Sequence, residues 1–165
     1  MKKLILISTL FITALACKTE TKDVIEVTEK ATTEVKESTK QIKEKLASKG
    51  FQIFDYVDEK TQDTIIMQQY FIAFLKRGPN RSQSQEETMQ LQNAHLAHLG
   101  KMYELGYADI SGPFGDDGDI RGITIYNVPT LKTADSLANA DPMVKSGRLV
   151  IEMHPWWAAK GFTLR

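Results

Sequence analysis

The sequence predicts an α+β fold in which four strands and two helices follow one another in the order β-α-β-β-α-β. Residues 69–76 form a continuous apolar, aromatic-rich run that is typical of a buried strand. Apolar residues then recur at helical spacing over residues 85–105. Two further strand-like runs, at residues 108–114 and 120–128, flank a turn rich in Gly and Asp.

The composition fits one modest globular domain. The chain has 165 residues, of which 42% are hydrophobic and 25% are charged. Its 21 Lys and Arg residues balance 21 Asp and Glu residues, so the formal net charge is zero. This balance creates no overall positive field for a phosphate backbone, and we expect no nucleic-acid binding. The composition also excludes a collagen, a coiled-coil rod and a polytopic membrane protein.

Residues 1–17 have the features of an export signal. Two lysines precede an apolar run at residues 4–15, which is too short to span a bilayer comfortably. The run leads into Ala16 and Cys17. Because Cys17 is the only cysteine, the chain can form no intrachain disulfide.

The last five residues of this segment, Thr-Ala-Leu-Ala-Cys, resemble a bacterial lipoprotein signal. In that family the cysteine is acylated and becomes the first mature residue. The resemblance implies that lipid on Cys17 anchors the protein to a membrane of the bacterial cell envelope. An ordinary secretory signal, cleaved near Ala16 or Cys17, is the alternative. Both interpretations place the mature chain outside the cytoplasm.

Residues 18–49 consist almost wholly of Lys, Glu, Thr and Ser. Sparse apolar positions at three- and four-residue steps, and the spacing of Glu26 and Lys30, indicate transient helix. The apolar surface is too small to be buried alone. We therefore predict a solvated, charged tether that lifts the domain off the membrane, with a weakly coiled partner helix as the alternative.

Residues 50–67 are predicted as an N-terminal extension, because residues 51–57 and 64–67 have strand character around a polar turn. The first helix of the main unit is expected to begin after Ser84, a good N-cap followed by an acidic first turn. It should end at Gly106. We expect its apolar, Met-rich face to lie in the core against the sheet.

Residues 68–165 hold the predicted β-α-β-β-α-β unit. Pro129 ends its third strand, and Thr130 or Thr133 can cap a short second helix. The last strand is predicted over residues 148–154. This order is that of the ferredoxin-like fold, in which helices cover one face of an antiparallel sheet. Because the other face is left uncovered, we expect a homodimer.

Short motifs follow one another through this unit. They are His95-Leu-Ala-His98-Leu, Gly106, Gly112-Pro113, Asp116-Asp117-Gly118, Arg121-Gly122, Ala134, Ala138, Asp141-Pro142, Gly147 and His154-Pro155-Trp156. In spacing and order, this set resembles the YCII-related family. The resemblance implies a dimeric α+β barrel with a cleft in each protomer. It also implies that His95 faces Asp141 as the catalytic pair.

A His and Asp pair in a cleft suits acid/base catalysis. The imidazole can take or give a proton at working pH, while the carboxylate fixes its tautomer and stabilises the imidazolium. Such a pair fits proton abstraction next to a carbonyl, isomerisation or elimination from a small ring compound, none of which needs a bound cofactor. The sequence has no nucleophile motif and no phosphate-binding Gly loop.

We therefore expect a cofactor-independent enzyme of the lyase or isomerase type that acts on a small molecule. The alternative is a non-catalytic module of the cell envelope, which binds a small ligand or serves in assembly through the same cleft. A His95 that is shielded in a cleft within hydrogen-bond reach of Asp141 would favour catalysis. An Asp141 that only caps its own turn, beside a solvated His95, would favour binding or structure.

The candidate site residues also have structural explanations. Asp141 precedes Pro142 and is a good helix N-cap. His95, His98 and His154 have the residue type of metal ligands, but no carboxylate or cysteine is spaced with them. We therefore predict no metal site.

Arg121, His154 and Trp156 are further candidates for the substrate pocket. The aromatic end of the last strand suits either a wall of the cleft or burial at a dimer interface. Arg77, Arg81 and Arg121 have the chemistry to hold an anionic substrate group, and each is equally explained as a loop charge.

Overall fold

The computed structural model of the chain describes residues 37–164. The predicted export signal with Cys17, and the first part of the predicted tether, lie outside these residues. Within residues 37–164, no helix combines the length and the apolar character needed to cross a membrane.

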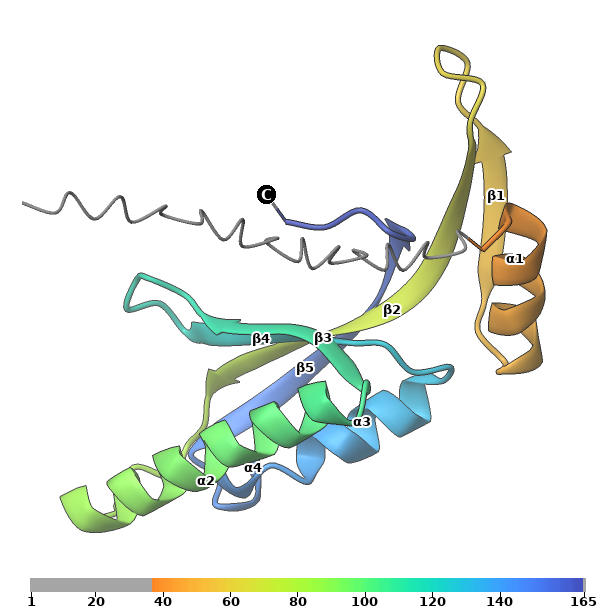
Figure 1. Cartoon of the computed structure of the whole chain (residues 1–165). Coiled ribbons are helices and arrows are strands. Elements are labelled where there is room, and N and C mark those ends of the chain that lie inside the picture. The colour runs from red at the N-terminus through yellow and green to blue at the C-terminus, as the bar shows by residue number, and fades with distance from the viewer. Residues whose placement is uncertain (1–36, 165) are drawn as a thin grey trace, which may run out of the picture. The chain divides into compact units, whose positions relative to one another are not determined.

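Five antiparallel strands form one sheet (Figure 1). They are β1 (Ile53–Val57), β2 (Thr64–Arg77), β3 (Ala108–Pro113), β4 (Ile120–Tyr126) and β5 (Leu149–Ala159). β2 pairs with β5 along one edge and, along the other, with β1 near its start and β4 near its end. β3 pairs with β4. The order β3-β4-β2-β5 confirms the predicted ferredoxin-like α+β fold.

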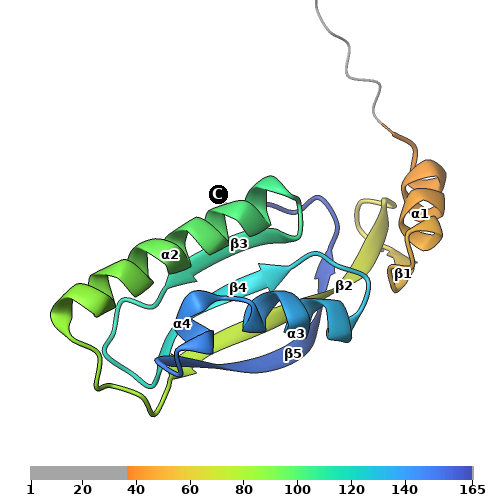
Figure 2. The ribbon, with the colours of Figure 1, turned by 90° about the horizontal axis from the view of Figure 1, so that it is seen from below.

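Three helices cover one face of this sheet: α2 (Gln85–Glu104), α3 (Leu131–Asn139) and α4 (Pro142–Lys145) (Figures 1 and 2). Alternate residues of β2 point toward them, because successive strand residues face opposite sides. The core cluster on this face comprises Phe71, Ala73, Leu75, Met102, Ala108, Tyr126, Val128, Ala134, Ala138, Met143 and Leu149. The main hydrophobic core therefore lies between the sheet and the helices.

The helix ends follow the capping signals in the sequence. The Ser84 side chain accepts a hydrogen bond from the backbone N–H of Glu87, and the Glu87 carboxylate accepts one from the backbone N–H of Ser84. Gly106, with a φ of 69°, follows the end of α2. Thr130, rather than Thr133, caps α3, since its hydroxyl accepts from the backbone N–H of Thr133.

The apolar face of α2 lies in the core only in part. Of the residues in α2, only His95 and Met102 are buried. Met89 and Leu96 are each 55% exposed, and Tyr103 is 69% exposed. The apolar face of α2, which was expected to lie in the core, is therefore exposed in part, and Leu96 lines an open cleft between α2 and the sheet.

β5 continues beyond the predicted end at His154 and runs to Ala159. Pro155, which lacks a backbone N–H, pairs with Phe71 of β2 inside this strand. The strand tolerates Pro155 because β5 pairs with β2 alone and is an edge strand of the described sheet.

The end of the predicted tether belongs to the folded unit. Thr39–Ser48 form helix α1, which Ser38 caps. Leu46 of α1 is buried, and Nζ of Lys43 lies 2.7 Å from a carboxylate oxygen of Asp55 on β1. α1 therefore packs against the hairpin of β1 and β2, and the folded part begins before residue 50.

Candidate active site

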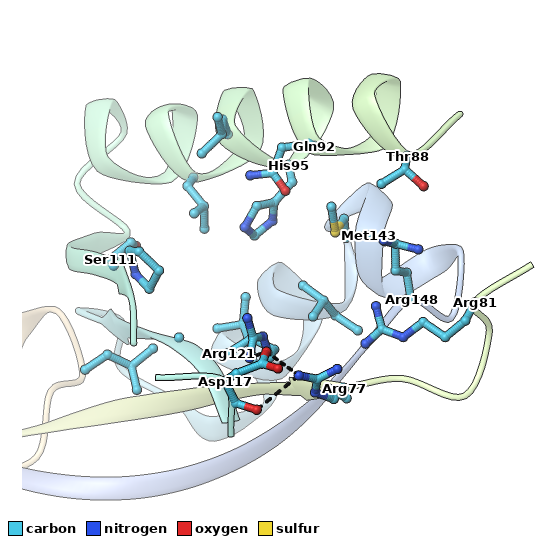
Figure 3. Close-up of a pocket in the computed structure, with 18 residues that line it drawn as sticks. Arg77, Arg81, Thr88, Gln92, His95, Ser111, Asp117, Arg121, Met143 and Arg148 are labelled. Carbon is cyan, nitrogen blue, oxygen red and sulfur yellow. Dashed lines mark hydrogen bonds and ion pairs between the residues drawn. The ribbon is translucent and has the colours of Figure 1, made fainter. Parts of the chain in front are cut away.

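A cleft of about 520 Å³ lies between α2 and the helix-covered face of the sheet (Figure 3). Its apolar lining comes from Leu75, Leu96, Leu99, Ile123, Met143 and Leu149. Polar and charged side chains from α2, β2, β3, β4 and the adjoining loops complete the lining. Figure 3 shows His95 projecting from α2 into this space. A concave, largely apolar site with a few polar groups is the usual form of a small-molecule site.

His95 and Asp141 are brought together at this cleft. Nδ1 of His95 lies 2.6 Å from Oδ2 of Asp141, although the two residues are 46 positions apart in the chain. The side chain of His95 is 11% exposed and that of Asp141 is 3% exposed. This places a hydrogen-bonded pair of titratable groups away from bulk water.

Asp141 also starts helix α4. Its Oδ1 accepts a 2.8 Å hydrogen bond from the backbone N–H of Met143, and Pro142 occupies the first turn of the helix. Asp141 can therefore cap α4 and contact His95 at the same time, because each carboxylate oxygen has its own partner. The cap fixes the carboxylate in the position from which it contacts His95.

This arrangement determines which nitrogen of His95 faces the cleft. An ionised carboxylate can only accept hydrogen bonds, so Nδ1 of a neutral His95 carries the proton that Asp141 accepts. Among residues 37–164, no group hydrogen-bonds Nε2 of His95. Nε2 therefore presents its lone pair as a proton acceptor.

Tyr126, a buried residue of β4, lies near Asp141. Burial and then the negative charge of Asp141 raise the pKa of the Tyr126 hydroxyl above its usual value. Tyr126 therefore stays neutral at physiological pH, and it adds no second negative charge beside Asp141.

Arg77 and Arg121 meet at the floor of the cleft (Figure 3). Both donate to Oδ1 of Asp117, which lies in the turn between β3 and β4. Both also donate to the backbone carbonyl of Gly118. Arg121 therefore lies in the cleft lining, and its side chain also holds this turn.

Arg81 and Arg148 lie at the end of the cleft nearest to Thr88 (Figure 3). Arg148 was not singled out in the sequence, where nothing in its neighbourhood marks it as a site residue. The pairing of β2 with β5 is the signal that identifies it. Leu149 pairs with Arg77, so the residue before Leu149 must lie beside the end of β2.

His154 and Trp156 do not reach the cleft. They lie on the face of β5 that points away from the helices, where His154 contacts Glu152 at 2.9 Å. The three histidines accordingly do not form a cluster. Within residues 37–164, no three His, Cys, Asp or Glu side chains lie close enough together to hold a metal ion.

Comparisons with known proteins identify a family and solved structures with a similar fold. The sequence profile of the YCII-related domain matches residues 70–156, which is more than half of the chain. No curated protein matches the chain. A 5-chloro-2-hydroxyhydroquinone dehydrochlorinase from Burkholderia phenoliruptrix AC1100, solved in complex with 2,5-dihydroxybenzoquinone, is 23% identical. The match covers 53% of this chain and 92% of that one, with a TM-score of 0.40.

Proposed function

The chain belongs to the family of YCII-related domains, and on that premise we propose that it is a cofactor-independent enzyme for small carbonyl or ring compounds. In this proposal His95 is the general acid/base and Asp141 positions it. The observation that carries the proposal is the 2.6 Å contact between Nδ1 of His95 and Oδ2 of Asp141 beside an open cleft.

The proposed reaction begins with proton abstraction by Nε2 of His95. The proton comes from a carbon next to a carbonyl, and the electron pair left behind delocalises onto the carbonyl oxygen as an enolate. Asp141 stabilises the imidazolium that forms. Return of the proton to a different carbon gives an isomer, whereas loss of a leaving group from the neighbouring carbon gives an elimination product.

The cleft supports this chemistry by its size and lining. Its volume of about 520 Å³ falls within the range of sites for small organic ligands. Leu99 and Met143 contribute apolar side chains to the lining that His95 shares, and apolar lining limits the water around the imidazole. A less hydrated site strengthens the electrostatic interaction between Asp141 and an imidazolium at His95.

Proton exchange provides a test that does not require the natural substrate. A panel of cyclic ketones, lactones and 2-oxo acids is incubated with the full chain in D2O, and the loss of the proton next to the carbonyl is followed by 1H NMR. We expect exchange with at least one class, and about 100-fold slower exchange with His95→Gln. Asp141→Asn should slow it as well, since it retains the cap but removes the negative charge.

His98→Gln is the matched control, because it changes a histidine on the same helix that does not line the cleft. Its exchange rate should equal that of the wild type. Exchange that is absent for the whole panel, or that His95→Gln leaves unchanged, contradicts the enzymatic proposal. The alternative of a non-catalytic ligand-binding or assembly module would then be the better explanation.

We propose, further, that the protein acts as a homodimer through the uncovered face of the sheet. Ile72 and Phe74 of β2 lie on this face, beside Glu152, His154 and Trp156 of β5. Trp156 is 42% exposed in the single chain. Partly exposed aromatic and aliphatic side chains on one sheet face are typical of a surface that another subunit covers.

Export and lipid attachment rest on the sequence of residues 1–17 alone. We propose that the chain is anchored in the cell envelope through acylated Cys17, with the folded unit outside the cytoplasm. Expression in a bacterial host with an alkyne-tagged fatty acid tests this proposal. Label should enter the wild type and not Cys17→Ser. An unlabelled wild type found in the periplasm or medium would support the ordinary secretory signal instead.

A further inference from the structure

The charges along the cleft are strongly unbalanced. Its lining includes four arginines, Arg77, Arg81, Arg121 and Arg148, but only one carboxylate, that of Asp117. The chain as a whole carries no net charge. The excess of positive charge is therefore a local property of this cleft.

Two of these arginines are explained by the fold. Arg77 and Arg121 share the carboxylate of Asp117 and donate to backbone carbonyls of the turn between β3 and β4. Arg77 and Arg121 thus stabilise that turn at the floor of the cleft, and their positions require no ligand.

Arg81 and Arg148 are not explained in this way. Within residues 37–164, neither of them forms an ion pair, and Arg81 has no hydrogen-bond partner. Arg148 donates only to the neutral side-chain amide of Gln83, at 3.2 Å. Arg81 is exposed, and desolvation, followed by the positive charges of Arg148, Arg77 and Arg121, lowers its pKa. The folded chain therefore holds like charges together without a compensating anion.

We propose that the cleft binds a small organic anion, whose carboxylate or comparable oxyanion is held by Arg81 and Arg148. This inference rests on the proposed function and names the substrate class for the same site. Guanidinium groups suit the role, since their planar forks match the geometry of oxyanions. Figure 3 places the two arginines at one end of the cleft and the ring of His95 farther along it. A substrate anchored by its anionic end would present its other end to Nε2 of His95.

The test compares benzoate with benzamide, which have similar shape but differ in charge. Each is titrated into the full chain, the affinity is taken from the NMR line broadening of the probe, and shifts of the His95 ring protons locate it in the cleft. We expect benzoate to bind about tenfold more tightly than benzamide, and this preference to shrink as salt is added. The measurement needs no turnover, so it remains informative if proton exchange is not observed.

Three variants separate anion binding from general damage to the fold. The double variant of Arg81→Gln and Arg148→Gln should lose the preference for benzoate while benzamide binding is retained. Asp117→Asn should bind benzoate several-fold more tightly, because it removes the one negative charge of the cleft lining. Lys101→Gln, which removes a positive charge from the far end of α2, is the matched control and should behave like the wild type.

Several outcomes would overturn the inference. They are equal affinities for the two probes, failure of both to bind at tens of millimolar, and a benzoate preference that survives in the double variant. Loss of binding for both probes in the double variant would indicate damage to the cleft. The pair Arg81→Lys and Arg148→Lys, which keeps the charges, must then restore benzoate binding, or the inference fails.

Discussion

Gly78 and Gly147 approach each other so closely that a Cβ atom on Gly78 would lie 2.2 Å from the carbonyl oxygen of Gly147. Gly78 follows β2 and Gly147 precedes β5, and the backbone N–H of Gly78 donates to the carbonyl of Arg148. The two chain segments that carry Arg77 and Arg148 are thus held together where only a glycine fits.

Gly78→Ala should therefore destabilise the protein by about 1–3 kcal/mol, because backbone atoms rather than a flexible side chain oppose the new methyl group. Gly100→Ala is the matched control, since nothing lies within 4 Å of its Cβ position in α2. It should stabilise by about 0.5–1 kcal/mol through helix propensity. Urea denaturation of both variants measures the difference. Equal effects would contradict the close approach.

Asp141→Ala should lower stability more than Asp141→Asn. The alanine variant loses the cap of α4 and leaves Nδ1 of His95 without its partner, at a combined cost of about 2–4 kcal/mol. Asparagine can keep the cap through its single oxygen, and its amide NH2 can then donate to Nδ1 of the other tautomer of His95. Thermal and urea denaturation check this order. If the two variants were equally stable, the cap of α4 would contribute nothing.

Stability should fall in alkaline solution because of Tyr70. Burial, and then the charge of Asp109, raise the pKa of Tyr70 from 10.0 to about 12. Between these pH values the unfolded chain loses the Tyr70 proton while the folded chain retains it, so the free energy of unfolding decreases as pH rises. Tyr70→Phe should show a shallower decrease over this range in urea titrations. Parallel pH curves for the variant and the wild type would contradict the raised pKa.

Phe74→Asp should convert the proposed homodimer into a monomer. Phe74 lies on the uncovered face of the sheet, where its ring contacts that of His154 edge-on with centroids 5.6 Å apart. A carboxylate at this position would have to be buried unpaired in the dimer. Sedimentation velocity measures the mass of each form. Met89→Asp, on the exposed face of α2, should remain dimeric, and a monomeric wild type would overturn the dimer proposal.

The sequence predicted those parts of the fold that local chemistry decides. Ser84 and Glu87 satisfy each other's backbone donors, so the start of α2 could be placed from four residues. Asp141 and Pro142 marked the start of a helix in the same way. The hairpin between β3 and β4 follows from its Gly- and Asp-rich turn.

Features that depend on tertiary packing could not be predicted from these patterns. The last strand was predicted to end at His154, but β5 continues through Pro155 because it is an edge strand of the described sheet. Trp156 was a candidate for either the cleft wall or a dimer interface, and strand alternation places it on the face that points away from the cleft. Leu46 is buried because α1 packs against β1 and β2, and the sequence of α1 alone does not show this packing.

The candidate site, too, depends on tertiary contacts that local sequence patterns do not show. The pairing of His95 with Asp141 was expected from the family resemblance, and no local pattern joins two residues 46 positions apart. Arg148 became a cleft residue only through the pairing of β2 with β5. When strand register brings distant residues together, the local sequence around each residue contains no motif that identifies it as part of the site.

The strand pairing of β2 differs along its length, and this difference determines which part of the sheet can unfold locally. Residues 71–76 pair with strands on both sides, while residues 64–65 pair with β1 alone. The outer part of β2 and its hairpin with β1 can therefore separate from the sheet in a local fluctuation, and the inner part can open only when the whole sheet does. The cleft is built on the inner part. Its geometry is consequently protected by the global stability of the domain, and it should persist while the N-terminal hairpin exchanges its amide protons with solvent.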